Sequence, residues 1–205
     1  ELNSSYIYSN VSRLVIDYNR KLDARNKNDN TFHACALKTE LLVDKDGEEV
    51  IIPIPGNNFS KEGDFIREEH RRYEKYVTPY RDSGYEMIER MRKNHKKSYL
   101  IMVHSFFPVY NGDVRSVDIG VLHGNACDGP IKIIKNLRKN CDLNIGDNEP
   151  WHFDDADGSI FSRVEEMTDV DLIVFDINNK HLRTEDGIRK MADLILNSFK
   201  DLDID

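Results

Sequence analysis

The heptapeptide DLIVFDI at residues 171–177 decides the fold, because so short an apolar run between polar residues indicates a strand buried on both faces. Residues 98–103 have the same character, and we expect them to form a second strand inside the same sheet. Residues 117–122 predict a shorter strand, and the β-branched residues of 11–17 predict another.

Helices are predicted between and after these strands. Apolar residues at helical spacing predict a helix over residues 60–94, which Pro79 should kink or split, and the charged residues 67–72 should face solvent. Residues 130–139 predict a second helix, and Thr184 is the predicted cap of a third. Residues 41–52 predict a hairpin around Gly47. Strands alternating with helices are typical of the α/β class. The predicted buried face of the last helix consists of Ile188, Met191, Ala192, Ile195 and Phe199.

Composition excludes several classes of function. The chain has 205 residues and a formal net charge of −8, so its surface repels phosphate backbones, and we expect no nucleic acid as partner. None of its apolar runs approaches the ~20 residues of a membrane span, so we expect no membrane either. Three scattered cysteines without a Cys-x-x-Cys pair favour a reducing, cytoplasmic location. The length predicts a single domain over residues 1–205.

Three of the predicted strands lead into residues that can carry chemistry. Asn19 and Arg20 follow the first strand, His104 follows the second, and Asp176 ends the last. In open α/β sheets, ligands bind at the carboxyl ends of strands. A histidine that holds a metal, a carboxylate that activates water and an arginine that binds a carboxylate together indicate a metal-assisted hydrolase of an anionic substrate.

Each of these residues also has a plain structural interpretation. A histidine after a strand is more often a hydrogen-bonded surface residue than a metal ligand, and an Asn-Arg pair can bind acidic neighbours. A single carboxylate at the end of a buried strand carries little weight. The joint occurrence of the three gives the structural and functional interpretations about equal weight. His123 is expected to end a strand, and His152 to lie in a turn.

Several blocks of sequence occur in the order found in one known family. Residues 11–20, VSRLVIDYNR, carry a Ser-Arg-x-x-x-Asp-x-Asn-Arg pattern, and residues 56–80 supply the next block. A central block covers residues 104–122, GDNEPW follows at 146–151, and residues 176–187 supply a last strand end. Over nearly the whole chain, these blocks resemble those of the N-formylglutamate amidohydrolases.

The resemblance implies a three-layer α/β sandwich with a central mixed sheet, similar in fold to the zinc carboxypeptidases. It implies zinc as cofactor with His104 as a ligand, Asp176 as the catalytic base, and Asn19, Arg20 and Arg115 as substrate-binding residues. The implied partner is a small anionic N-acyl amino acid such as N-formylglutamate, cleaved at its formyl amide.

The sequence departs from the family pattern in two respects. The family's other metal ligands lie in a segment upstream of the Asn-Arg strand, so we expect that a further segment precedes residue 1. Asp176 and Asn178 stand where the family has glutamate and arginine. A catalytically silent member that binds a small anionic ligand, and a carboxypeptidase-like hydrolase, are therefore the alternative interpretations.

Overall fold

The computed structural model describes residues 4–22, 35–45, 48–110, 112–124, 128–153, 164, 166–200 and 202. They belong to two compact units, each with β-structure of its own. The sheet unit comprises Met91–Ala156 and Arg163–Asp205 with Glu1–Ser4. The hairpin unit comprises Ser5–Arg90 with Asp157–Ser162.

A four-stranded mixed sheet forms the centre of the sheet unit. Its strands are β3 (Ser98–Phe106), β8 (Val170–Asn178), β6 (Ile119–His123) and β7 (Ile145–Asp147), in the order β3-β8-β6-β7. β8 runs parallel to β3 and antiparallel to β6, while β6 and β7 are parallel. A small hairpin of β4 (Val109–Tyr110) and β5 (Asp113–Val114) follows β3.

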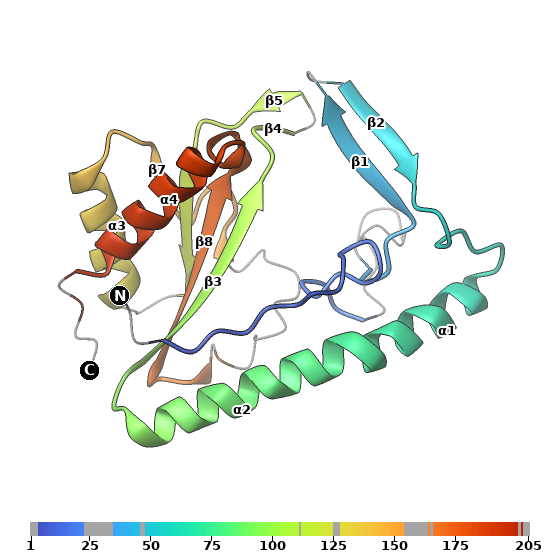
Figure 1. The fold of residues 1–205 in the computed structure, drawn as a ribbon, viewed down its shortest axis with the longest axis horizontal. Helices are drawn as coiled ribbons and strands as arrows, with labels where there is room; N and C mark the ends of the chain where they lie inside the picture. The colour runs from blue at the N-terminus through green and yellow to red at the C-terminus, as the bar shows by residue number, and fades with distance from the viewer. Residues whose placement is uncertain are drawn as a thin grey trace. The chain divides into compact units, whose positions relative to one another are not determined.

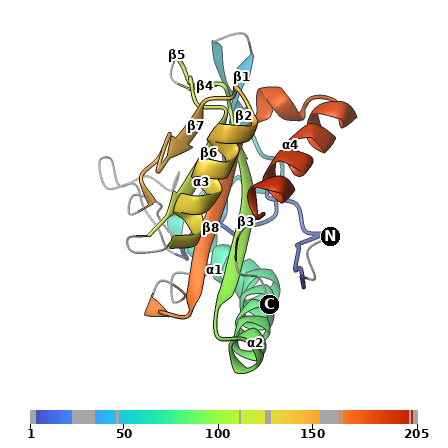
Figure 2. The same cartoon turned by 90° about the vertical axis from the view of Figure 1, so that its left-hand side faces the viewer.

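Two helices lie on one face of this sheet (Figures 1 and 2). These are α3 (Asp128–Asn140) and α4 (Glu185–Ser198), and their apolar faces close a core with β6 and β8. The core includes Ile133, Leu137, Phe175, Ile177 and Met191. The predicted α/β class and mixed sheet are confirmed, while the three-layer, zinc-exopeptidase-like arrangement stays a prediction.

β3 lies at the edge of the sheet and not inside it, so this part of the prediction is wrong. Within the described residues β3 pairs with β8 alone, and Val103 is 62% exposed. Tyr99 and Ile101 pack against the helical core from β3, whereas β8 is buried along its whole length. An apolar run therefore indicated burial correctly for β8 but did not distinguish an edge strand from a central one.

The last helix begins where its sequence predicts. The Thr184 hydroxyl accepts a hydrogen bond from the Gly187 N–H at 3.1 Å, which caps α4. Met191 and Phe199 are buried as predicted. Ile188 and Ala192 are exposed, however, because α4 packs on the sheet and α3 through a narrower stripe than the spacing suggested.

The predicted hairpin is present in the hairpin unit. β1 (Glu40–Lys45) and β2 (Glu48–Pro53) pair antiparallel, with Leu42 opposite Ile51. β2 ends at Pro53, which has no N–H to donate to a further strand.

A long helix follows the hairpin (Figure 1). α1 (Glu62–Arg72) continues through a π-helical turn, η2 (Tyr73–Val77), into α2 (Thr78–Asn94). Two α-helices are thus present as predicted, but the irregularity lies just before Pro79. The Thr78 N–H donates to the Tyr73 carbonyl, five residues back, so the backbone bonding changes where the proline cannot donate.

Residues 11–17 form turns, and the predicted strand is absent. The Ser12 carbonyl accepts the N–H groups of Val15 at 2.8 Å and Ile16 at 3.4 Å. Ile16 and Asp17 are nevertheless buried, so the apolar pattern indicated burial and not strand pairing. Asn19 and Arg20 therefore follow a turn and do not lie at the end of a strand.

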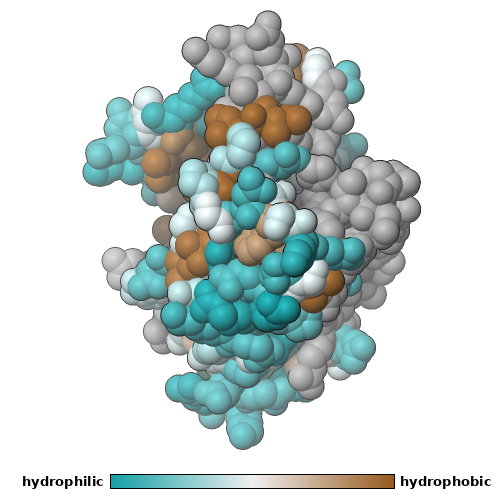
Figure 3. Space-filling model, turned by 90° about the vertical axis from the view of Figure 1, so that its right-hand side faces the viewer, coloured by the Kyte–Doolittle hydropathy of each residue, from teal (hydrophilic) through white to brown (hydrophobic). Residues whose placement is uncertain are grey.

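The charged stretch of α1 is only partly solvent-facing. The Arg67 side chain is 79% exposed, but Glu69 is fully buried and the Arg72 side chain is 14% exposed. Among the described residues that Figure 3 colours, hydrophilic ones predominate, with smaller separate hydrophobic areas. Among the described residues, no helix has the length and apolar character needed to cross a bilayer.

Candidate functional site

His104 and Asp176 lie side by side near the carboxyl ends of two parallel strands. They are register partners on β3 and β8, and partnered residues of adjacent strands present their side chains to the same face of a sheet. Asp176 is buried, and His104 is half-buried. The structure therefore brings these two predicted site residues together.

The two carboxylate oxygens of Asp176 have different surroundings. Oδ2 accepts a hydrogen bond from Nε1 of Trp151 at 3.0 Å, whereas the buried Oδ1 has no hydrogen-bond partner among the described residues. Burial raises the pKa of Asp176, and the Trp151 hydrogen bond and the positive charge of Arg115 oppose this rise. A buried carboxylate with one unpartnered oxygen and a raised pKa has the properties of a general base.

Arg115 is held next to this carboxylate by aromatic rings. Its Cζ atom lies 4.0 Å from the centre of the Trp151 ring and 5.5 Å from that of Phe106, both within the range of cation–π interaction. The Arg115 N–H donates to the Pro108 carbonyl at 2.8 Å, which anchors its backbone. The sheet unit thus gathers a carboxylate, a histidine, an arginine and an indole in one place.

Asn19 and Arg20 lie in the hairpin unit, beside the buried Asp17. The Asn19 N–H donates to Oδ1 of Asp17 at 3.0 Å, and Arg13 forms an ion pair with Oδ2 at 2.8 Å. Burial, followed by the charge of Arg20, lowers the pKa of Lys38 to about 8, although Asp17 acts in the opposite direction. Three basic side chains around one carboxylate suit an anionic ligand.

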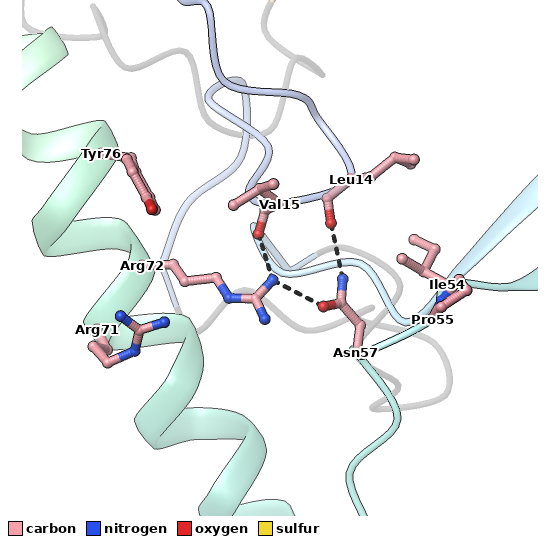
Figure 4. Close-up of a pocket in the computed structure, with 9 residues that line it drawn as sticks. Leu14, Val15, Ile54, Pro55, Asn57, Arg71, Arg72 and Tyr76 are labelled. Atoms are coloured by element: carbon pink, nitrogen blue, oxygen red, sulfur yellow. Dashed lines mark hydrogen bonds between the residues drawn. The ribbon is translucent and has the colours of Figure 1, made fainter.

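The turn segment that leads to Arg20 is held by side chains from elsewhere in the hairpin unit (Figure 4). Nδ2 of Asn57 donates to the Leu14 carbonyl at 2.9 Å, and Nη1 of Arg72 donates to the Val15 carbonyl at 2.9 Å. Arg72 also donates to Oδ1 of Asn57 at 2.8 Å, which ties the two supports together. These residues line a cavity of about 410 Å³, and their polar groups form the structural hydrogen bonds described above.

Two other residues considered from the sequence have structural roles. Asn178 is fully buried; its side chain donates to the Val117 carbonyl at 3.1 Å and accepts from the Lys180 N–H at 3.2 Å. His123 ends β6, as predicted, and its Nε2 lies 3.0 Å from Oδ1 of Asp147. The amide of Asn178 is thus occupied by the backbone.

Sequence reasoning missed Trp151 as a site residue. Its signal was present, since Trp151 closes the GDNEPW block and is the only tryptophan of the chain. It also missed Glu69, whose buried Oε1 accepts the Leu37 N–H at 3.2 Å. Helical charge spacing alone does not reveal a contact with a segment 32 residues away.

A zinc site needs more ligands than the described residues place together. A catalytic zinc takes three protein ligands. In the part of the chain that the structure describes, no three His, Cys, Asp or Glu side chains are grouped so that they could hold a metal ion. The described residues alone therefore do not fit a zinc centre, and His104 as a ligand stays a prediction.

The fold has a relative of known structure. The chain is similar to the structure described as "The crystal structure of gene product Atu2144 from Agrobacterium tumefaciens", with 24% identity and a TM-score of 0.69 over 92% of this chain and 67% of that one. The comparison with curated proteins gives no match. The structural likeness supports the fold alone.

The fold and the site define an α/β protein with a buried carboxylate, a histidine and an arginine near the carboxyl ends of its strands. The family model described as N-formylglutamate amidohydrolase matches residues 1–182, so the chain belongs to this family of hydrolases. The resemblance seen in the sequence blocks is confirmed.

Proposed function

We propose that the chain is an amidohydrolase that cleaves the N-formyl or N-acyl amide of a small acidic amino acid such as N-formylglutamate. The family match over residues 1–182 supports the reaction class. The observation that carries the proposal is the unpartnered Oδ1 of buried Asp176, beside His104 and the Arg115 guanidinium.

The side chains suggest how the reaction proceeds. Oδ1 of Asp176 takes a proton from water, and the resulting hydroxide oxygen adds to the formyl carbon. The C–N bond then breaks, and the proton moves from Asp176 to the departing amine, so that formate and the free amino acid are the products. Zinc is the proposed cofactor with His104 as one ligand, but the steps assigned here belong to the protein's own residues.

Substrate binding is assigned to basic residues. Arg115 presents its guanidinium beside Asp176, and a guanidinium binds a carboxylate through paired N–H groups. Asn19 and Arg20 remain the proposed residues for a carboxylate of the substrate, because Arg20 belongs to a cluster of basic side chains.

The test is release of formate from N-formylglutamate, measured with and without added zinc. We expect Asp176→Asn to lower kcat by about a hundredfold or more, since it removes the base. Arg115→Met should raise KM roughly tenfold or more through loss of a charge-assisted contact. Asp171→Asn is the matched control, because Asp171 is buried near the opposite end of β8 and pairs with Lys97.

The alternatives give different results in the same assay. Saturable binding of N-formylglutamate without formate release would indicate a silent, anion-binding member of the family. Release of amino acids from unblocked dipeptides, without deformylation, would indicate a carboxypeptidase-like hydrolase. Full turnover by the Asp176→Asn variant would refute the role of this carboxylate.

A further inference from the structure

Trp151 contacts both of the charged groups at the site in the sheet unit. Its indole N–H donates to Oδ2 of Asp176 at 3.0 Å, and the face of its ring lies 4.0 Å from Cζ of Arg115. Trp151 is 38% exposed. The reaction steps proposed above do not use this side chain, although it contacts both their base and their cation.

The backbone around Trp151 is fixed by β6. The Asn148 N–H donates to the Val121 carbonyl at 3.0 Å, and the Asn148 side chain bonds both the N–H and the carbonyl of His123, at 3.0 and 3.1 Å. Gly120 admits the segment, because a Cβ atom there would overlap the Glu149 carbonyl oxygen. The indole therefore projects from a segment bonded to the same sheet that carries Asp176.

The indole hydrogen bond distinguishes the two oxygens of Asp176. Oδ2 is occupied by the N–H of Trp151, and Oδ1 is left without a partner. Asp176 pairs with His104 on β3 and with Gly120 on β6. Because glycine has no side chain, the His104 ring is the only side chain of these two partners that could compete with Trp151 as a hydrogen-bond donor. The hydrogen bond thus occupies Oδ2 and leaves Oδ1 as the oxygen that the proposed function assigns as proton acceptor.

We propose that Trp151 is a positioning residue, whose N–H orients the Asp176 carboxylate and whose ring face orients the Arg115 guanidinium. The inference rests on the proposed function, because it assigns the base and the anion-binding cation as the groups to be oriented. One side chain then sets the distance between the proton acceptor and the substrate's charged end.

Trp151→Phe separates the two contacts, because phenylalanine keeps an aromatic face for Arg115 but has no N–H. We expect it to lower kcat about tenfold, with KM nearly unchanged. Trp151→Leu removes the ring as well and should also raise KM. Equal effects of the two variants on kcat and on KM would overturn the proposal.

The fluorescence of the single tryptophan tests the contact without any turnover. Asp176→Asn removes the negative charge that the indole N–H faces, so we expect the emission of this variant at pH 7 to differ from that of the wild-type protein. Identical emission of the two proteins would overturn the proposal. Absence of formate release would refute the proposed function alone, because the fluorescence result is independent of it.

Discussion

Asp118 is predicted to stabilise the sheet unit as the acceptor of several hydrogen bonds. Its Oδ1 accepts from Nζ of Lys180 at 2.7 Å and Nε2 of His181 at 2.6 Å, and its Oδ2 accepts from the Asn144 N–H at 2.9 Å. These contacts join the start of β6 to the 3₁₀ turn η5 (Asn179–Leu182) that follows β8. Asp118→Asn removes the negative charge from this junction while keeping its size.

The loss of stability expected in Asp118→Asn follows from the pKa of Asp118. Burial raises this pKa, but the bonds from Lys180, His181 and Asn144 outweigh it and lower the pKa from 3.8 to about 2. At about 1.36 kcal/mol per pH unit, this corresponds to ~2.4 kcal/mol of stability. The Lys180 side chain is 42% exposed, so solvent screening reduces the expected loss in Asp118→Asn to roughly 1–2 kcal/mol at pH 7.

The pH dependence has a definite sign. Because the folded-state pKa lies below the unfolded value of 3.8, the stabilisation is present above about pH 4 and is lost as the pH falls through 2. The free energy of unfolding should be measured in urea, by circular dichroism, at pH 7, 5 and 3.5. The difference in the free energy of unfolding between wild type and Asp118→Asn should be the same at pH 7 and pH 5 and smaller at pH 3.5.

Two further variants make the result decisive. Asp142→Asn changes an exposed aspartate and should leave the free energy of unfolding unchanged. Lys180→Met should lower the free energy of unfolding of the wild-type protein. It should lower it less in the Asp118→Asn variant, because the Asp118–Lys180 pair is already broken there. Wild-type stability of Asp118→Asn at pH 7, or a loss that does not diminish towards pH 3.5, would refute the reasoning.

Three further substitutions test individual contacts. Glu69→Ala should cost about 1–3 kcal/mol in urea unfolding, because the buried Leu37 N–H loses its acceptor, whereas Glu69→Gln keeps an acceptor and should cost less. Gly120→Ala should destabilise the sheet unit and shift the tryptophan emission, since its Cβ would displace the Glu149 carbonyl; unchanged emission would contradict this. Asp176→Asn should be more stable than wild type at pH 7. The folded-state pKa of Asp176 is raised above 3.8, so ionisation costs stability as the pH rises, and the advantage should disappear below about pH 3.8.

Local pattern predicted the elements whose ends and burial are fixed by adjacent residues. Thr184 caps α4 through a residue three positions away, and DLIVFDI forms a strand buried along its whole length. The pattern was less informative about pairing. Residues 11–17 are buried without joining a sheet, because the carbonyls of Leu14 and Val15 bond to side chains from distant parts of the hairpin unit.

Only the part of the site that lies near the ends of strands could be predicted from the sequence. His104 and Asp176 are adjacent because β3 and β8 are parallel and in register, which the sequence suggested by placing both near strand ends. The contact between Trp151 and Asp176 spans 25 residues and depends on the segment that crosses Gly120. The spacing of apolar residues along the chain does not reveal such a contact, so Trp151, which donates to the proposed base Asp176, was not predicted.

Charge explains why an anionic substrate would need local recognition in this protein. The net charge of −8 provides no long-range attraction for an anion, and exposed charges are screened beyond about 10 Å. Binding therefore has to come from cations held in place, and Arg115 is held by two aromatic rings while Arg20 lies near Lys38. Aromatic faces hold a guanidinium without neutralising it. The packing of Arg115 against Trp151 therefore fixes the position of this cation while keeping its charge.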